Sequence, residues 1–343
     1  MTQPIRQRER SCGQTLRHIT IYDQGIHNFW LDSDEGGNEG EGSLLNGQNA
    51  YLMSIPFALP DAVYAAGSQR SVGKLYPWAH QQAIEEGPRN VTGTRIGDPC
   101  SSLSLSRTYI GSQRFCSFIW SGDITATWET IGAQVSVGLS AAFTGWGWWT
   151  LDAGGFYADS TIYWSNNVDE PQYQQLFVRW LQWTTFLPFM RAHGARLCYK
   201  TGFSELSKRA LVICLRYQLA PYIRAIFDRF HTTGSMIMRP LFVDSSVTDS
   251  SIGPMTANNS NYTTQQYMFG PKLLVTPVTL PNVTEWSVYL PQTGNSNGTK
   301  RWTYWWTNET YLGGQVVTVA TPLEHIPVFH LGSRADILGG HVY

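Results

Sequence analysis

The sequence predicts an α/β fold in two parts, a partial (β/α)8 TIM barrel followed by an all-β sandwich domain. Before Gly234, strand-like runs that end in polar or acidic residues alternate with loops and amphipathic helical runs, which is β/α alternation. After Gly234 the pattern changes to alternating, β-branched runs separated by turn residues. We therefore predict an N-terminal segment over 1–24, the partial barrel over 25–234 and the sandwich over 235–343.

Barrel strands are expected where a short aromatic or aliphatic run ends in a polar residue. Four such runs are Ile26–Asp32, Leu103–Arg107, Phe115–Trp120 and Gly145–Leu151. They are followed or ended by three acidic residues, Asp32, Asp123 and Asp152. In a (β/α)8 barrel the carboxyl ends of the parallel strands converge at one pole, which carries the catalytic groups. About five β/α units can be counted, fewer than the eight of a closed barrel.

The helical segments are less evenly marked. The run Ile124–Ala142 reads as a helix, and either Asp123 or Thr125 can act as its N-cap by accepting an orphan backbone N–H. Residues 50–67 also look helical, although the run contains two prolines. Glycine and proline recur throughout 68–100, which predicts a long loop with short elements.

Two further helices and a series of strands are expected toward the C-terminus. Amphipathic runs near 171–190 and 204–230 predict helices, the second kinked at Pro221. The strands of the sandwich are expected at Met236–Val243, Gln266–Val278, Trp286–Leu290, Trp302–Trp306, Val316–Ala320 and Ile326–Leu331.

The charge and composition exclude several kinds of partner. The chain has 343 residues, a net charge of −1 and only 14% charged residues, so nothing indicates binding to a nucleic acid or to an anionic membrane. No apolar run approaches the roughly 18 residues that a membrane-spanning helix needs. The 14 Trp and 17 Tyr residues suit a protein that stacks aromatic rings on sugars, although large barrels are aromatic-rich in any case.

Glycosylation and cysteine patterns indicate a secreted or endomembrane-lumenal protein of a eukaryote. N-x-S/T sequons occur at Asn90, Asn258, Asn261, Asn282, Asn297 and Asn308. The cysteines show no CxxC spacing; one or two disulfides, for instance Cys100 with Cys116, are possible, but the sequence leaves the pairing open. The first ten residues lack the apolar core of a signal peptide, so we expect that an N-terminal portion precedes this chain.

Paired carboxylates at strand ends suit glycoside hydrolysis. That reaction needs two carboxyl groups flanking the anomeric carbon, and the retaining form places them roughly 5–5.5 Å apart. Asp32 in FWLDSDE and Asp123 in IWSGDITATWE each follow an aromatic strand end, where Trp30 and Trp120 can exclude water and stack on a sugar. Taken alone, either aspartate is more often a structural residue, and Asp123 is also well placed as a helix cap.

A series of motifs along the chain strengthens this interpretation. They are FWLDSDE (29–35), RTYIGSQRFCSFIWSGD (107–123), WTLDAGGF (149–156), PFMRAHG (188–194), LRYQLAPYI (215–223), MRPLF (238–242), MFGPKLLVTPV (268–278) and PLEHIPVF (322–329). In this order they resemble the motifs of glycoside hydrolase family 31, the α-glucosidases and α-xylosidases. The resemblance runs from about Gly25 to about Gly332, and residues 1–24 match poorly.

The resemblance implies a retaining, exo-acting α-glycoside hydrolase that acts on oligosaccharides or polysaccharides and needs no metal or organic cofactor. It implies Asp32 as nucleophile and Asp123 as general acid/base. The residues implied to bind the substrate are Arg107, Asp152, His193, Trp30, Trp120 and Phe156. The family's first barrel strands and an N-terminal β-domain should precede Gly25, so the missing N-terminal part of the same enzyme is an expected partner.

Three alternatives stay open from the sequence. The wording of SGDI and LDSDE is slightly closer to the α-xylosidase branch, but a glucosidase remains possible. Asp32-Ser33-Asp34 is a D-x-D that could chelate a divalent metal in a nucleotide-sugar transferase, although nothing Rossmann-like precedes it. An inactive carbohydrate-binding fragment or pseudo-enzyme of the same family would use the same aromatic pocket without turnover.

Overall fold

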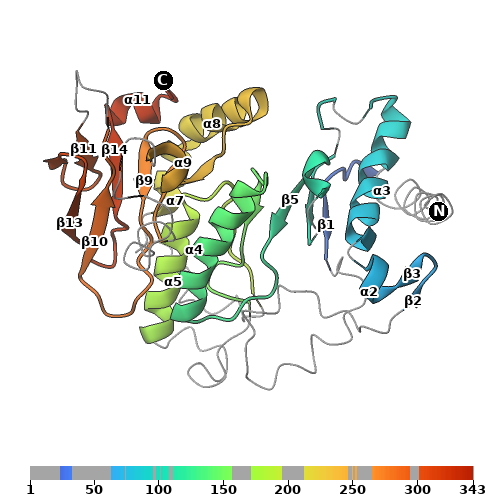
Figure 1. Ribbon diagram of the computed structural model, residues 1–343, viewed down its shortest axis with the longest axis horizontal. Coiled ribbons are helices and arrows are strands. Elements are labelled where there is room, and N and C mark those ends of the chain that lie inside the picture. The colour runs from blue at the N-terminus through green and yellow to red at the C-terminus, as the bar shows by residue number, and fades with distance from the viewer. Residues whose placement is uncertain are drawn as a thin grey trace. The chain divides into compact units, whose positions relative to one another are not determined.

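The computed structural model (Figure 1) describes a little over half of residues 1–123 and most of residues 124–343. The described residues are 24–32, 63–73, 75–95, 98–100, 102–107, 111–156, 171–194, 212–245, 249, 252, 265–293 and 301–342. The chain divides into two compact units, Met1–Asp123 and Ile124–Tyr343. Residues 33–62, which include most of the helix expected over 50–67, lie outside the described residues.

The first unit contains a parallel sheet. Strands β1 (Phe29–Leu31), β4 (Ser104–Ser106) and β5 (Ser117–Trp120) lie side by side in the order β1-β4-β5. Both pairings are parallel, and Leu31, Ser106 and Ile119 stand level with one another. Three of the expected barrel strands are therefore confirmed, each shorter than its apolar run, and their carboxyl ends meet at one edge of the sheet.

Helix α3 (Leu75–Thr92) corrects the loop expected over 68–100. The glycines and prolines of this stretch, including Pro88 inside the helix, favoured a loop. However, the middle of α3 is buried on all sides, over residues 81–85 and 87–89, with Ala83 and Ile84 in the core, and this burial outweighs the low helix propensity of the sequence. Smaller elements flank it: β2 (Val63–Tyr64), β3 (Gly67–Ser68), α2 (Gln69–Val72) and the 3₁₀ helix η4 (Ser112–Arg114). The β2–β3 hairpin takes the place of the helical end expected at 63–67.

The second unit begins with helix α4 (Trp128–Phe143), and its start corrects the expected cap. The N-cap is Thr127, whose backbone is extended and whose Oγ1 accepts a hydrogen bond from the Thr130 N–H at 3.0 Å. Neither Asp123 nor Thr125 fills that position. Helix capping was the structural explanation that the sequence offered for Asp123. Because Thr127 is the cap, that explanation does not apply.

Three further helices and a short strand complete the barrel part of the second unit. Strand β6 (Trp149–Thr150) precedes α5 (Pro171–Thr184), as expected. Of the helix expected over 204–230, residues 204–211 lie outside the described residues, and the rest falls into two helices, α7 (Val212–Gln218) and α8 (Ala220–Thr233), with Pro221 in the first turn of α8. A proline has no N–H to lose in a first turn, so Pro221 starts a helix and does not kink one.

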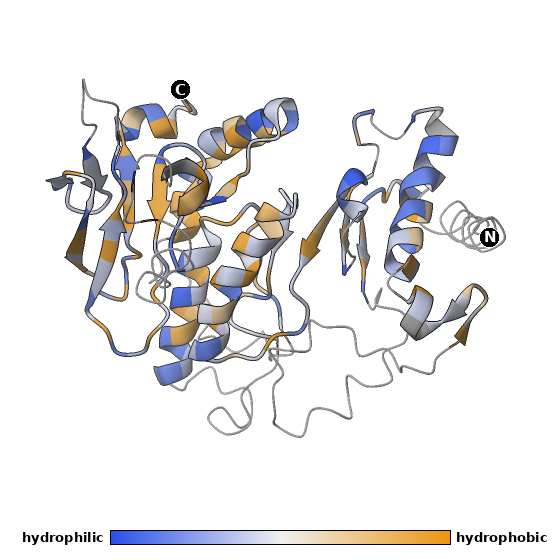
Figure 2. Cartoon of the chain, in the orientation of Figure 1, coloured by the Kyte–Doolittle hydropathy of each residue, from blue (hydrophilic) through white to orange (hydrophobic). Residues whose placement is uncertain are grey.

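The C-terminal part is an antiparallel β-sandwich. One sheet has the order β12-β11-β14-β9-β8-β7 and the other pairs β10 with β13. The strands and helices are β7 (Met238–Pro240), α9 (Leu241–Ser245), β8 (Tyr267–Phe269), β9 (Leu273–Val275), β10 (Glu285–Leu290), β11 (Trp302–Tyr304), β12 (Thr310–Tyr311), β13 (Gln315–Ala320), β14 (Val328–Leu331) and α11 (Arg334–Leu338). Residues of both sheets share one buried cluster, among them Leu274, Val288, Trp302, Val319 and Phe329. Strand β9 is hydrophobic along its whole length in Figure 2, as befits a central strand buried on both faces.

Helix α5 is joined to the sandwich by polar contacts. Arg179, which is buried, donates from its guanidinium to the carbonyl oxygens of Thr321 at 2.8 Å and His325 at 2.6 Å. Gln182, one turn further on, donates to the carbonyl of Leu323 at 2.6 Å. Burial lowers the pKa of Arg179 to about 10. These bonds link the buried polar side of α5 to carbonyl groups of the segment 321–325.

Two further features concern the cysteines and the helices. Cys100 and Cys116, the example pairing from the sequence, form a disulfide, and Cys214 is free and exposed. Among the helices that the structure describes, none has both the length and the apolar character to cross a membrane.

Candidate active site

Strand register places Asp32, Arg107 and Trp120 at one level. Leu31 pairs with Ser106, and Ser106 pairs with Ile119. Asp32, Arg107 and Trp120 are the next residues along the three parallel strands. Because parallel strands run in the same direction, these side chains emerge together at the carboxyl edge of the sheet.

Side-chain alternation then sorts which of them share a face. Successive side chains of a strand point to opposite sides, so Trp30 and Asp32 share a face, and the pairing of Trp30 with Leu105 and Phe118 assigns Arg107 and Trp120 to the same face. The contacts agree with this assignment. The Trp30 and Trp120 rings meet edge to face with centroids 6.0 Å apart, and the Arg107 guanidinium lies 5.3 Å from the centroid of the Trp120 ring.

Arg107 forms ion pairs with both predicted catalytic carboxylates, Asp32 and Asp123. Its Nη2 lies 2.9 Å from Oδ1 of Asp32 and 3.3 Å from Oδ1 of Asp123. The Arg107 side chain is 6% exposed, while that of Asp123 is 13% exposed and that of Asp32 is 51% exposed. A buried cation thus holds two acids, from different strand ends, at one point.

The shared nitrogen limits the separation of the two acids. The two Oδ1 atoms cannot be farther apart than the sum of their distances to Nη2. For this pair of oxygens the limit is below the roughly 6.5 Å at which the carboxyl separations of inverting glycosidases begin, and it is compatible with the roughly 5–5.5 Å of retaining enzymes. The two carboxyl groups also differ in environment, because Asp32 is half exposed and Asp123 is largely buried. Unequal environments are what two carboxylates need to play different roles in one reaction.

A second group of predicted site residues lies within the second unit. Strand β6 and the segment that follows α5 run parallel: Thr150 Oγ1 donates to the Phe189 carbonyl at 2.9 Å, and Ala153 forms a parallel bridge with Ala192. Asp152 comes just before this bridge and is fully buried. Its Oδ1 lies 3.1 Å from Nη2 of Arg191.

Arg191 is a residue that the sequence analysis missed. It stands two positions before His193 on an extended segment, so both side chains share a face. That spacing within PFMRAHG was the available signal. Because Arg191 is the cation that neutralises a fully buried carboxylate, we include it among the candidate site residues.

The remaining predicted residues, Phe156 and His193, lie together. Their rings are 5.5 Å apart, centroid to centroid. Phe156 ends a tight loop in which Gly155 adopts a φ of +78° and approaches Ala126 so closely that a Cβ would stand 2.5 Å from its backbone. The Phe156 N–H donates to the Ile124 carbonyl at 2.6 Å. Gly155 of DAGGF is therefore required by the packing of this loop, and Gly154 favours it through its own left-handed backbone, with a φ of +86°.

The predicted site residues consequently fall into two groups, each within one compact unit. Trp30, Asp32, Arg107, Trp120 and Asp123 form the first, and Asp152, Phe156 and His193, with Arg191, form the second. Within the residues that the structure describes, no cluster of three or more His, Cys, Asp or Glu side chains could hold a metal ion. Asp34 of the D-x-D lies outside the described residues.

The predicted glycosylation sites are only partly described. Asn90 on α3, and Asn282 and Asn308 in turns with positive φ, are exposed. The other three sequons, at Asn258, Asn261 and Asn297, lie outside the described residues.

Comparison with known proteins identifies the family. Residues 7–225 match the TIM-barrel domain of glycosyl hydrolases family 31, and residues 234–333 match the C-terminal domain of glycosyl hydrolase family 31. The predicted fold class, a barrel part followed by a β-domain, is thereby confirmed.

Individual relatives agree with the family match. The chain is 62% identical over 335 residues to alpha-xylosidase A of Aspergillus niger, covering 94% of this chain and 45% of that protein. It is 32% identical to an alpha-xylosidase of Saccharolobus solfataricus, covering 94% of this chain and 39% of that protein. A solved xylosidase from Aspergillus niger superposes with a TM-score of 0.86 at 60% identity, over 97% of this chain and 48% of that one. The chain spans less than half the length of these relatives, and it belongs to glycosyl hydrolase family 31.

Proposed function

We propose that this chain carries the catalytic pair of a retaining, exo-acting α-glycoside hydrolase of the α-xylosidase type. The observation that carries the proposal is the meeting of Asp32 and Asp123 at Nη2 of Arg107. Family membership supplies the class of reaction, because the family's matched relatives are named as glycosidases.

The geometry suggests how the roles divide. Asp123 protonates the departing glycosidic oxygen while Asp32 attacks the anomeric carbon and forms a glycosyl–enzyme ester. Asp123, now a carboxylate, then removes a proton from water, which attacks the anomeric carbon and releases the sugar. Arg107 binds sugar hydroxyl groups and keeps both acids oriented. Trp30, half exposed beside this pair, offers a ring face on which a sugar can stack.

The second group completes the proposed set of substrate-binding residues. His193 donates a hydrogen bond to a sugar hydroxyl. Asp152 either contacts the substrate directly or orients Arg191, with which it forms an ion pair, toward the substrate. Trp120 in the first group and Phe156 in the second each offer apolar surface to a sugar. The proposal includes the predicted domain boundary, with the barrel part ending at Gly234 and the β-sandwich beginning at Ser235.

For the sugar we propose a terminal α-linked xylose. The support is the 62% identity to a protein named alpha-xylosidase A. A xylosidase pocket fills the space that the C6 hydroxymethyl group of glucose would occupy, and a difference of this size is worth roughly 10- to 200-fold in kcat/KM.

The test is a comparison of p-nitrophenyl α-xyloside with p-nitrophenyl α-glucoside, using the full-length protein. We expect kcat/KM to favour the xyloside by at least about tenfold. A preference for the glucoside would contradict the proposed sugar. Binding of xylose without turnover of either substrate would favour a carbohydrate-binding pseudo-enzyme.

We further propose that the chain works with the N-terminal part of the same enzyme and passes through the secretory pathway. The longer relatives support the first statement. The Cys100–Cys116 disulfide and the exposed sequons at Asn90, Asn282 and Asn308 support the second, because disulfides persist in oxidising compartments. Removal of N-glycans by an endoglycosidase should lower the apparent mass of protein purified from its source, and an unchanged mass would contradict the second statement.

A further inference from the structure

A buried polar stripe on α3 contacts the starts of β4 and β5, two of the three strands that carry the proposed site. Gln81, Glu85 and Arg89 are spaced four residues apart, which places them on one side of the helix. Their exposed fractions are only 0%, 5% and 3%. Gln81 Nε2 donates to Oγ of Ser104, the first residue of β4, at 2.8 Å. Buried polar side chains are costly unless their partners are fixed, so this stripe is a specific contact with the sheet.

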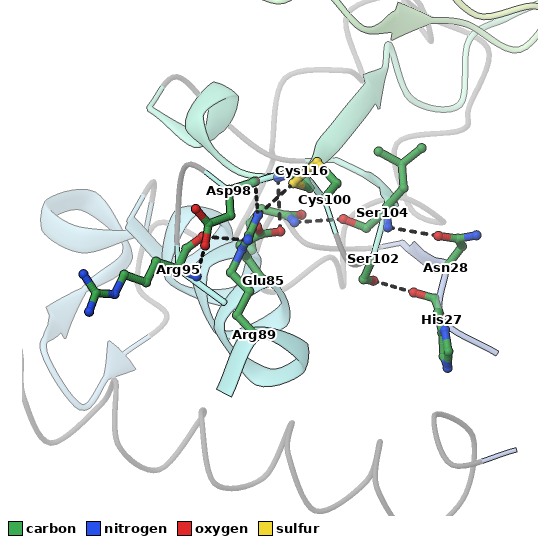
Figure 3. The surroundings of a disulfide bond; sticks show 12 residues. His27, Asn28, Glu85, Arg89, Arg95, Asp98, Cys100, Ser102, Ser104 and Cys116 are labelled. Carbon is green, nitrogen blue, oxygen red and sulfur yellow. Dashed lines mark hydrogen bonds and ion pairs between the residues drawn. A yellow bond between two sulfur atoms is a disulfide. The ribbon is translucent and has the colours of Figure 1, made fainter. Parts of the chain in front are cut away.

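Glu85 and Arg89 form an ion pair that holds Cys116, the residue before β5 (Figure 3). Arg89 Nε donates to Oε1 of Glu85 at 2.5 Å. Oε2 of Glu85 accepts the Cys116 N–H at 3.2 Å, and Nη2 of Arg89 lies 3.3 Å from Cys116 Sγ. The pair therefore fixes both the backbone and the sulfur of Cys116.

Arg89 also holds the other side of the disulfide. It donates to the carbonyl oxygens of Arg95 at 2.6 Å and Asp98 at 3.0 Å, on the segment that leads to Cys100. Cys100 is then bonded to Cys116 across a separation of 16 residues. One guanidinium and one disulfide thus tie the end of α3 and the segment before β4 to the start of β5, as Figure 3 shows.

This cluster lies next to the first register pair of β4 and β5. The Ser104 N–H donates to the Cys116 carbonyl at 3.1 Å, and Ser104 pairs with Ser117. Three residues further along each strand, the same register places Arg107 level with Trp120. A slip of one residue would turn Arg107 to the opposite face of the sheet and away from the acids.

We propose that the Cys100–Cys116 disulfide, with Glu85 and Arg89, positions Arg107 for the reaction by fixing the register of β4 against β5. The inference rests on the proposed function, since it gives Arg107 its role. None of these residues touches the reacting atoms; they act through Arg107. A misplacement of about 1 Å at a catalytic group can cost roughly 100-fold in rate, so a loosened register should be visible in kinetics.

The first experiment reduces the disulfide in the folded full-length protein. Dithiothreitol converts Cys100 and Cys116 to two thiols while it is oxidised to its cyclic disulfide, and Cys100 is exposed to it. We expect kcat per active site, titrated with a mechanism-based inactivator, to fall by about 10- to 100-fold while the circular dichroism spectrum is retained. The Cys100→Ser/Cys116→Ser double variant should match reduced wild type and ignore dithiothreitol. The Cys214→Ser variant, which removes the free exposed cysteine, should behave as wild type.

A double-mutant cycle separates positioning from general stability. If the disulfide acts through Arg107, the losses from Arg107→Lys and from removal of the disulfide should overlap, and the combined variant should be little worse than Arg107→Lys alone. Additive losses, or unchanged kcat per titrated site after reduction, would overturn the inference. If the double cysteine variant does not fold, the reduced and oxidised forms of wild type and of Arg107→Lys supply the four corners of the cycle.

The same set of proteins distinguishes this inference from the proposed function. Turnover by Asp32→Ala at the wild-type rate would defeat the proposed function itself. An inactive Asp32→Ala together with an additive cycle would defeat only the positioning role of the disulfide.

Discussion

Asp32 and Asp123 meet at a single nitrogen atom, with Oδ1 of the first 2.9 Å and Oδ1 of the second 3.3 Å from Nη2 of Arg107. The two acids come from the ends of different strands, and Arg107 comes from the strand between them. The arrangement follows from parallel pairing, which brings strand ends together whatever their separation in the sequence. Because the three residues come from the ends of three different strands, substitution of each one can measure its separate contribution to catalysis.

The Asp32→Ala variant should lose turnover while it stays folded. Removing the nucleophile of a covalent mechanism costs roughly 10⁴- to 10⁶-fold in kcat. The Asp32 side chain is half exposed, so its loss should change the melting temperature little. Sodium azide, a small anion that fits the vacated space, should restore turnover and yield a glycosyl azide. Asp336→Ala, at an exposed carboxylate on α11, is the matched control and should retain full activity.

The Asp123→Ala variant should show a loss that depends on the leaving group. A general acid contributes roughly 10²- to 10⁴-fold where the departing oxygen needs a proton. We therefore expect a large loss of kcat/KM with a natural disaccharide and a much smaller loss with an aryl glycoside whose phenol is acidic. Measurement of both substrates on one preparation checks this. Equal losses for the two substrates would argue against the acid role.

Arg107→Lys should weaken catalysis although it preserves the charge. A lysine ammonium is a point charge on a flexible stem and lacks the planar guanidinium that contacts Trp120 and both acids. We expect kcat/KM to fall by about 100-fold. Steady-state kinetics check the value. Wild-type kinetics in this variant would show that Arg107 only fills space.

Gly155→Ala should destabilise the second unit by more than its backbone conformation alone explains. Both Gly155 (φ +78°) and Gly145 (φ +93°) are in the left-handed region, but only Gly155 has backbone atoms 2.5 Å from a would-be Cβ. Strained backbone of this kind costs of order 1–3 kcal/mol, and the clash with Ala126 adds to it. Gly145→Ala is the control for the conformation. Thermal melting of both variants should give the lower midpoint for Gly155→Ala, and equal midpoints would contradict the close packing of this loop.

Stability should decline as the pH falls below about 6.5, in part because of His330. Burial is the main cause that lowers the pKa of His330 from its ordinary value of 6.5, and the same holds for His325. The unfolded chain therefore binds protons at a higher pH than the folded chain does. This stabilisation is complete above 6.5 and is lost as the pH falls toward the lowered pKa. Melting temperatures between pH 8 and 5 should decline less steeply in His330→Phe than in wild type, and parallel profiles would exclude His330 as a contributor.

The sequence predicts those parts of the fold and site that depend on local signals, and it predicts poorly those that depend on contacts between residues distant in the chain. The strands that carry Asp32, Arg107 and Trp120 have local signals, since each is a short apolar run that ends in a polar residue. Their common level at one sheet edge then follows from parallel pairing, so the first group of site residues could be predicted. The start of α4 shows the limit of local signals: Asp123, Thr125 and Thr127 are all acceptable caps, and only the folded backbone selects Thr127.

Long-range contacts account for what the sequence did not reveal. Helix α3 contains residues that break helices, and it is stabilised by burial in the core and by contacts of Gln81, Glu85 and Arg89 with residues 23 to 31 positions further along the chain. For Arg191 the only local signal is its two-residue spacing from His193, and its role becomes clear only from its ion pair with the buried Asp152. The disulfide was one of several possible pairings and is fixed by the approach of Cys100 to the start of β5. In each case the partner, and not the local pattern, decides the structure.

The most direct measurement of the central claim is covalent trapping of the nucleophile. A 5-fluoro-xylosyl fluoride should form a long-lived ester with full-length protein, because the fluorine slows release of the sugar from the intermediate. Peptide mapping by mass spectrometry should then find the added sugar on Asp32, with none on Asp123. A label on any other residue, or hydrolysis of α-xylosides with no label formed, would contradict the assignment of Asp32 and Asp123.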